Sequence, residues 1–239
     1  MTAKISPAVA APAPTLDARL TLLFAMTCAL AVANVYFAQP LLDSMARSLA
    51  VVPAQIGVVV TATQVGYGLG LLFIVPLGDL LNRKVLMLCQ LVLSAVALAV
   101  AGAAQQWPTL LVAMVLVGLL AVLVQVVIAY AAALASPVQR GQVVGTVTSG
   151  VVLGILLARL TAGVIADIAG WRAVYFVSAA LMLVAAGLLW KLVPSTGRTG
   201  QAASYGALMR SLFGLFITER TLQIRGVLAM FGFAAFSVL

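Results

Sequence analysis

Residues 108–135 read PTLLVAMVLVGLLAVLVQVVIAYAAALA and contain no charged side chain. A helix needs about 20 consecutive, mostly apolar residues to cross the hydrocarbon core of a bilayer. Inside that core the backbone has no water to bond to, so the segment must satisfy its own N–H and C=O groups as a helix. The stretch therefore predicts a membrane-spanning α-helix.

Apolar runs of similar length recur on both sides of this stretch, and together they predict six spans. In chain order the runs are Leu20–Leu41, Ile56–Gly78, Val85–Ala104, Pro108–Ala135, Val143–Ile168 and Ala173–Val193. A seventh run begins near Gly226 and reaches Leu239 after about 14 residues, short of the length that a span needs. We therefore expect an all-α, polytopic membrane protein: a six-helix bundle with a truncated seventh helix.

Composition agrees with a protein whose solvent is lipid. Of the 239 residues, 64% are hydrophobic and 8% charged, and the mean hydropathy is +1.22. A soluble globular domain carries about 25% charged residues. The net charge of +8 comes from basic residues in short connections between the runs, so we expect no nucleic-acid partner.

Residues with catalytic or metal-binding chemistry are scarce. The chain has no His, and its two cysteines, Cys28 and Cys89, lie inside apolar runs, which favours two separate thiols over a disulfide or a metal site. No nucleophile with a partner base, paired carboxylate or phosphate-binding loop is recognisable, so we expect neither an enzyme nor a cofactor. A channel is disfavoured as well, because the spans carry no filter-like repeat or ring of charges.

Basic residues in the connections predict the orientation, because short cytoplasmic loops carry an excess of Lys and Arg. With the N-terminus in the cytoplasm, ten of the 13 basic residues lie inside, Arg47 and Arg172 lie outside, and Arg159 falls within a span. We expect a multi-pass protein of the cell inner (plasma) membrane with a cytoplasmic N-terminus.

Four segments follow from these boundaries: a flexible cytoplasmic tail at 1–18, the six-helix bundle at 19–193, a cytoplasmic linker at 194–225, and the start of the seventh helix at 226–239. The linker is the natural connection between two bundles. In its part Tyr205–Ile217, apolar residues recur at helical spacing, namely Leu208, Leu212, Leu215 and Phe216. This pattern predicts an amphipathic helix on the membrane surface.

The connection after the second run carries a motif: Pro76-Leu77-Gly78-Asp79-Leu80-Leu81-Asn82-Arg83-Lys84. It resembles the cytoplasmic signature of the major facilitator superfamily, G-x-L-a-D-r-x-G-R-K, with Asp79, Arg83 and Lys84 at the acidic and basic positions. The chain departs from it at Val75, Leu80 and Asn82. Asn82, in place of the second Gly, can still adopt the left-handed conformation of a tight turn.

Two further stretches are similar to the drug- and metabolite-efflux proton antiporters of that superfamily. One is Asn34–Leu42, and the other begins at Arg140-Gly141 and continues through a Gly-rich span to Gly170-Trp171-Arg172. The resemblance implies an N-terminal half of a twelve-helix fold that works by alternating access on a small molecule and protons, with a C-terminal six-helix half as partner. It also implies a gate at Asp79, with Arg140 as the partner of its carboxylate when the cavity faces outward. A plain topology anchor at this turn is the alternative.

Arg159 is the most distinctive single residue, because a charged side chain within a span costs several kcal/mol (about 3 on insertion scales) unless it faces a cavity or a partner. At about 100° per residue it lies opposite Gly150 and Gly154, whose spacing suits close helix packing. Gly66 and Gly70 form a second face of this kind. We expect Arg159 to contribute to substrate or coupling-ion binding; the alternative is an Arg that extends to the outer headgroups.

Other polar residues within the spans are candidates for the same cavity. The full candidate set is Asn34, Tyr36, Gln39, Gln64, Tyr67, Gln125 and Arg159. For each of them an interhelical hydrogen bond is the alternative role. No acidic residue lies near the middle of a span, so a proton-coupling acid is expected in the C-terminal half, or a charge such as Arg159 takes its place. A half-unit or truncated membrane protein without transport activity is the competing interpretation of the whole chain.

Overall fold

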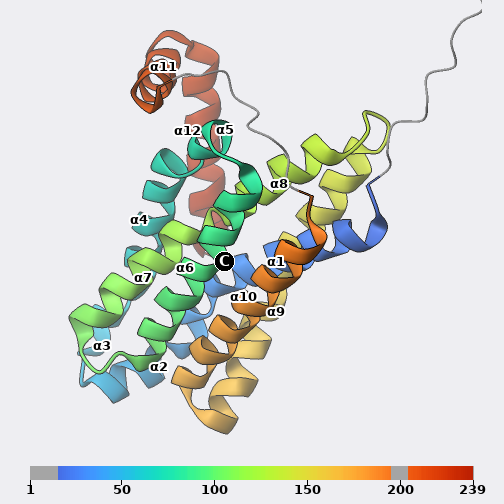
Figure 1. Ribbon diagram of the computed structural model, residues 1–239. Helices are drawn as coiled ribbons and strands as arrows, with labels where there is room; N and C mark the ends of the chain where they lie inside the picture. Colours follow the sequence, from blue (N-terminus) through green and yellow to red (C-terminus); the bar gives the residue numbers. More distant parts are fainter. Residues whose placement is uncertain (1–15, 195–203, 239) are drawn as a thin grey trace, which may run out of the picture.

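The computed structural model describes residues 16–194 and 204–238, and the regular structure in these two ranges is helical (Figure 1). The helices are α1 (Ala18–Tyr36), α2 (Ala38–Leu49), α3 (Pro53–Ile56), α4 (Val58–Phe73), α5 (Leu77–Leu80), α6 (Arg83–Ala103), α7 (Trp107–Ala121), α8 (Leu123–Leu134), α9 (Arg140–Ala169), α10 (Trp171–Leu192), α11 (Tyr205–Thr218) and α12 (Arg220–Val238).

Within the described residues, six segments are long and apolar enough to cross a membrane. They are Ala18–Tyr36, Ala54–Leu80, Arg83–Ala103, Trp107–Leu134, Arg140–Ala169 and Trp171–Leu192. The second span combines α3, α4 and α5, and the fourth combines α7 and α8. Each coincides with one predicted run, so the prediction of an all-α bundle with six spans is confirmed.

Prolines interrupt two of the predicted runs near their ends. Pro40 has no N–H for the carbonyl of Tyr36, and the helix breaks at Phe37, where α1 gives way to α2. Pro76 cannot donate to the carbonyl of Leu72, and turns at 74–76 separate α4 from α5. These breaks place Gln39 and Asp79 on short helices beside the longer ones.

The pairing of α1 with α9 is one of the closest contacts of the bundle. Gly150 and Gly154 of α9 lie directly against the backbone of Ala25 and Ala29 of α1, so closely that an added Cβ would overlap main-chain atoms. Without a hydrophobic driving force between helices in lipid, such small-residue contacts supply the packing energy.

The pairing of α4 with α7 uses glycines on both helices. A Cβ on Gly66 or Gly70 would overlap the backbone of α7 at Val115 or Leu119. In return, a Cβ on Gly118 of α7 would overlap the backbone of α4. The third close pair is α6 with α10, and α1 lies at the centre, in contact with α7, α8, α9 and α10.

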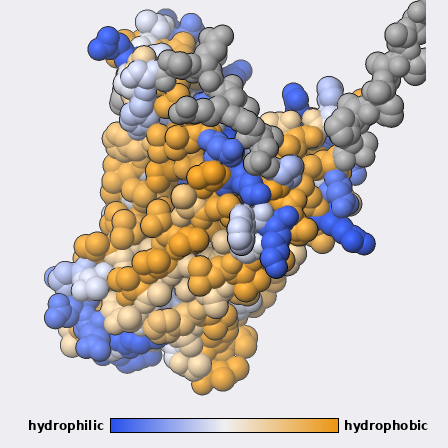
Figure 2. Space-filling model, in the orientation of Figure 1, coloured by the Kyte–Doolittle hydropathy of each residue, from blue (hydrophilic) through white to orange (hydrophobic). Residues whose placement is uncertain are grey.

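The surface has the pattern of a membrane protein. Figure 2 shows an apolar region between hydrophilic ends. The end that carries Arg83, Lys84, Arg140 and Lys191 is called here the basic end. At the opposite end, called the far end, Arg172 Nη1 donates to Ser48 Oγ at 2.7 Å and Nη2 donates to the Ala104 carbonyl at 3.1 Å, which joins α10, α2 and the end of α6.

The linker region lies only partly within the described residues. The predicted tail at 1–18 falls mostly outside them, as do residues 195–203 of the linker. The predicted amphipathic stretch is helical as α11, and Tyr205 Oη at its start donates to the Phe73 carbonyl at 3.0 Å, next to the break at Pro76. The predicted seventh run lies in α12, which begins earlier, at Arg220.

Candidate functional site

The motif at the basic end is built around the side chain of Arg83. Its Nη2 donates to Asp79 Oδ1 at 3.2 Å in an ion pair, its Nε donates to the Gly78 carbonyl at 3.0 Å, and its Nη1 donates to the Ala129 carbonyl at 3.3 Å. Arg83 is mostly covered, with 17% of its side chain exposed, whereas Asp79 is 67% exposed. Arg83 therefore ties α5 and the start of α6 to α8.

Lys84 connects the start of α6 to the end of α10. Its Nζ donates to the carbonyls of Trp190 at 2.8 Å and Val193 at 2.5 Å. Tyr130, buried in α8, donates its hydroxyl to the Pro194 carbonyl at 2.5 Å. The last carbonyls of a helix have no intrahelical partner and carry partial negative charge, so a cation and a hydroxyl are well placed there.

The conformation of Asn82 and the partner of Asp79 differ from the expectations for this motif. Asn82 is not left-handed: it has φ −63° and ψ 116°, and its side chain caps α6 by accepting from the backbone N–H of Lys84 at 3.0 Å and Val85 at 3.4 Å. The pair of Asp79 with Arg140, expected when the cavity faces outward, is not formed in this structure. Asp79 pairs with Arg83, one turn away, and Arg140 Nε donates to the Ala132 carbonyl at 3.1 Å.

Several of the candidate cavity residues gather on one flank of the bundle. Tyr36 of α1, and Gln64 and Tyr67 of α4, line a small cavity of about 100 Å³ together with Val151 and Ile155 of α9. Gln125 of α8 approaches the same group, with its Nε2 at 3.5 Å from Tyr67 Oη. Four separate spans thus contribute to one polar wall.

Arg159 continues this wall towards the far end. It follows Val151 and Ile155 at intervals of four residues and so lies on the same face of α9. Its Nη2 donates to Gln39 Oε1 at 3.0 Å, and its charge lies within electrostatic reach of Tyr36. Arg159 is exposed, so the guanidinium keeps donors for a further partner.

Asn34 does not belong to this wall. It is buried, with 2% of its surface exposed, and the hydroxyl of Ser178 on α10 donates to its Oδ1. Its place is the interface between α1 and α10, and the alternative role of an interhelical hydrogen bond therefore describes it. Asn34 and Tyr36 are two residues apart, about 200° around the helix, so the two side chains cannot share a face.

Residues that sequence reasoning missed are mainly partners of those that it found. Ser178 completes a contact between α1 and α10, and Gly118 completes the packing of α4 on α7. Tyr130 is a polar residue of the fourth run, and its hydroxyl reaches the Pro194 carbonyl just beyond the end of the sixth span. Gly118 has no second glycine four residues away, so the sequence does not identify it as a close-packing position.

These features define the class of the protein: a helical bundle with six membrane-spanning segments, a polar wall within the spans and a basic end with capped helices, as in secondary transporters. The sequence matches the Major Facilitator Superfamily over residues 22–239. The chain belongs to this superfamily, whose members are transporters and not enzymes.

Relatives among known proteins carry transporter names. The "Putative uncharacterized transporter YgaY" of Escherichia coli K12 is 40% identical over 224 residues, which cover 94% of this chain and 57% of that protein. The "Inner membrane transport protein YnfM" of the same organism is 26% identical over 165 residues, covering 69% of this chain and 40% of that protein. The chain thus spans little more than half the length of the first of these relatives.

Solved structures share the fold. A bacterial homologue of the human lysosomal transporter Spinster, in an inward-facing conformation, aligns with a TM-score of 0.63 at 16% identity, over 83% of this chain and 48% of that one. The xylose transporter XylE of E. coli, in a partially occluded inward-open conformation, aligns with a TM-score of 0.61 at 17% identity, over 91% and 60%. Each alignment thus covers only part of a longer chain.

Proposed function

We propose that the chain is the N-terminal half of a secondary active transporter that moves a small molecule by alternating access, with the polar wall as one side of its cavity. The observation that carries this proposal is the wall itself. Polar side chains at the middle of a membrane are expensive unless they face a cavity or a partner. Gln64 and Arg159 are both exposed at that depth, so they need an aqueous cavity or a second protein surface opposite them.

Uneven coverage of the spans supports a second half on this flank. The span that contains α4 is 28% buried and the one formed by α9 is 17% buried, whereas the other four are 44–61% buried. These two spans border the polar wall. A C-terminal six-helix half that packs on them would cover both and close the cavity between the halves.

Arg159 is the proposed centre of substrate binding. A guanidinium in a low-dielectric site binds carboxylate and phosphate groups through paired hydrogen bonds. Gln39 accepts a hydrogen bond from Nη2, and the exposed guanidinium has further donors for an anionic group. The substrate class that fits is therefore a small molecule with an anionic group.

The basic end is the proposed cytoplasmic gate, with the N-terminus on the same side, in the inner membrane of a bacterial cell. Its support is the positive-inside rule and the cluster of Arg83, Lys84 and Arg140 at one end of the bundle. In this proposal the motif holds α5, α8 and α10 together as one rigid rim, against which the second half opens and closes.

Proton-coupled efflux is the proposed mode, and its support is the similarity of Asn34–Leu42 to proton antiporters. Among the described residues the acids lie at or near span ends, namely Asp17, Asp43, Asp79, Asp167 and Glu219. The proton-binding acid is therefore assigned to the second half, or protons and substrate compete through the charge of Arg159.

Transport measurements test this proposal. The full-length protein is placed in everted membrane vesicles, and small carboxylates are added while the pH gradient is followed by acridine orange fluorescence. We expect Arg159→Ala to slow carboxylate-dependent proton release at least about tenfold, the effect of losing a hydrogen bond to a charged group. Arg47→Ala at the far end is the matched control. Equal rates for the parent and Arg159→Ala, at equal expression, would refute the role of Arg159.

A half-unit without transport activity of its own is the second candidate for the chain taken alone. The observation in its favour is the 57% coverage of the E. coli relative, together with the polar wall that lacks an opposite side among the described residues. Vesicles with residues 1–239 alone separate the two candidates. We expect no carboxylate-dependent proton release from them; release at the rate of the full-length protein would show that the chain transports by itself.

A further inference from the structure

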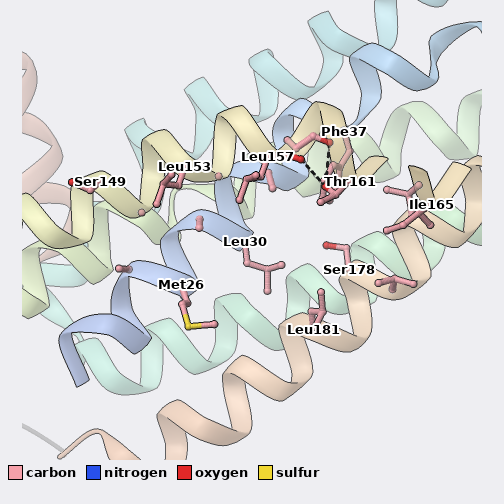
Figure 3. Close-up of a pocket in the computed structure, with 18 of the residues that line it drawn as sticks. Met26, Leu30, Phe37, Ser149, Leu153, Leu157, Thr161, Ile165, Ser178 and Leu181 are labelled. Atoms are coloured by element: carbon pink, nitrogen blue, oxygen red, sulfur yellow. Dashed lines mark hydrogen bonds between the residues drawn. The ribbon is translucent and has the colours of Figure 1, made fainter. Parts of the chain in front are cut away.

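A groove of about 540 Å³ runs along the flank of α9 that faces away from the polar wall. Its floor is α1 and its sides are α9 and α10. Figure 3 shows Met26 and Leu30 of α1, Leu153 and Leu157 of α9, and Leu181 of α10 around the same space. The volume is in the range of sites that hold small molecules in other proteins.

Helix packing explains why the groove is open. Gly170, with φ +81°, joins α9 to α10 at the far end. From that joint α9 packs chiefly on α1, whereas α10 packs chiefly on α6. The two helices therefore diverge and leave a gap above α1.

The groove is distinct from the proposed cavity. Arg159 follows Leu157 by two residues, about 200° around the helix, so the two point to opposite flanks of α9. A C-terminal half that packs on the polar wall leaves the groove facing the bilayer. This separation makes the inference independent of the transport proposal.

The residues that line the groove have few hydrogen-bonding groups that could bind water. Ser149 Oγ donates to the Gly145 carbonyl at 2.9 Å, Thr161 Oγ1 donates to the Leu157 carbonyl at 2.8 Å, and Ser178 Oγ donates to Asn34. The hydroxyls in the middle and far parts of the groove are thus already bonded inside the bundle. A buried water needs two to four polar partners, so hydrocarbon is the material that fits this space.

Charge points to the kind of molecule that supplies this hydrocarbon. Arg19 precedes Leu22 by three residues and Met26 by seven, so it lies on the groove face of α1, at the basic end. Its side chain is exposed. The remaining lining hydroxyl, Thr146, lies towards the same end of α9. Basic residues at a membrane border attract anionic headgroups.

We propose that the groove binds one acyl chain of an anionic phospholipid whose headgroup lies at Arg19. From Leu22 to Phe37 the floor spans 16 residues, roughly 22 Å of helix. It is therefore long enough to take a chain from one leaflet, which extends for about half of the ~30 Å hydrocarbon core. The lipid fills the gap between α9 and α10 and fastens α10 to the rest of the bundle.

Lipid retention in native mass spectrometry tests this proposal on the purified full-length protein. Phosphatidylglycerol and phosphatidylcholine with the same acyl chains are the probes. We expect the parent to retain phosphatidylglycerol at least about fivefold better, and Arg19→Gln to remove most of that preference, since one basic residue near the surface contributes on this scale. Arg47→Gln, at the far end, should keep it. An unchanged preference in Arg19→Gln would overturn the headgroup assignment.

A matched pair on α10 tests the groove itself. Leu181 lines the groove and is 46% exposed, whereas Leu183 is 52% exposed and does not line it. Leu181→Trp should fill the space and abolish retention of the lipid, and Leu183→Trp should leave it unchanged. Met26→Trp serves as a second filling variant, with the thermal midpoint of each protein as the check on folding.

Equal retention in the filled and the control variants, all folded, would mean that only loosely associated lipid is present, and the proposal would fail. It would fail equally if the full-length protein retained no lipid while residues 1–239 alone did, because the occupant of the groove would then be the second half. The transport assay with Arg159→Ala has no bearing on either outcome.

Discussion

Arg83 and Lys84 begin α6, at a helix terminus whose dipole disfavours positive charge. Arg83 reaches the carbonyls of Gly78 in α5 and Ala129 within α8. Lys84 resolves the conflict directly, because its side chain reaches carbonyls at the C-terminus of α10, where the dipole has the opposite sign. The same holds for Arg140, which donates to Ala132 near the end of α8. Basic residues that predict orientation from the sequence therefore also act as caps between helices.

Replacement of Lys84 tests this capping role. Lys84→Met removes the donors to Trp190 and Val193, and we expect it to destabilise the bundle by about 1–2 kcal/mol, the scale of hydrogen bonds from a charged group. Unfolding in a titration with sodium dodecyl sulfate measures the change. Lys191→Met, at the same end on an exposed site, is the control and should unfold as the parent does. Equal stability of the two variants would contradict the capping role.

A double-mutant cycle tests the partner of Asp79. The structure predicts coupling of Asp79→Asn with Arg83→Gln of up to about 1 kcal/mol, the usual limit for an exposed pair. It predicts no coupling of Asp79→Asn with Arg140→Gln. The same unfolding assay supplies all the stabilities. Coupling to Arg140 that exceeds coupling to Arg83 would show that the pair in this structure is not the dominant one.

Glycines control the approach of whole helices. The spacing of Gly150 and Gly154, and of Gly66 and Gly70, predicts close packing faces, and the structure has both faces in backbone contact with a neighbouring helix. The identity of the neighbour, α1 or α7, could not be predicted, because a single sequence shows which face is small but not what packs on it. Gly118 was missed for the same reason, since its role depends on the facing helix.

Two glycines on α4 provide a matched test at this scale. An added Cβ at Gly66 would overlap the backbone of α7, whereas around Gly68 there is nothing within 4 Å. We expect Gly66→Ala to destabilise the bundle by about 1–3 kcal/mol through overpacking. Gly68→Ala should be neutral or slightly stabilising, because Ala is the better helix former. Comparable stability changes in the two variants would show that the close contact of Gly66 with α7 does not determine the stability of this span.

At the scale of the whole molecule, composition and run lengths were enough to predict an all-α bundle with six spans, because a bilayer permits so few alternatives. The polar wall was harder to predict from the sequence. Tyr36, Gln64, Tyr67, Gln125 and Arg159 were selected as polar residues within spans, but only the packing of α1, α4, α8 and α9 brings them together. Asn34 has the same polarity and depth, and it lies in a different interface because of its position on the helix.

The central claim is that this wall borders a cavity that opens in turn to each side of the membrane. Reactivity of a cysteine at position 64 tests it most directly, in full-length protein with Cys28 and Cys89 replaced by Ala. Gln64 lines the wall, and Leu93 of α6, 53% exposed on the apolar surface, is the control. We predict that Gln64→Cys reacts with a membrane-impermeant maleimide from either side of the membrane, and that Leu93→Cys reacts from neither. A cysteine at position 64 that reacts from neither side, or no faster than one at position 93, would contradict the account.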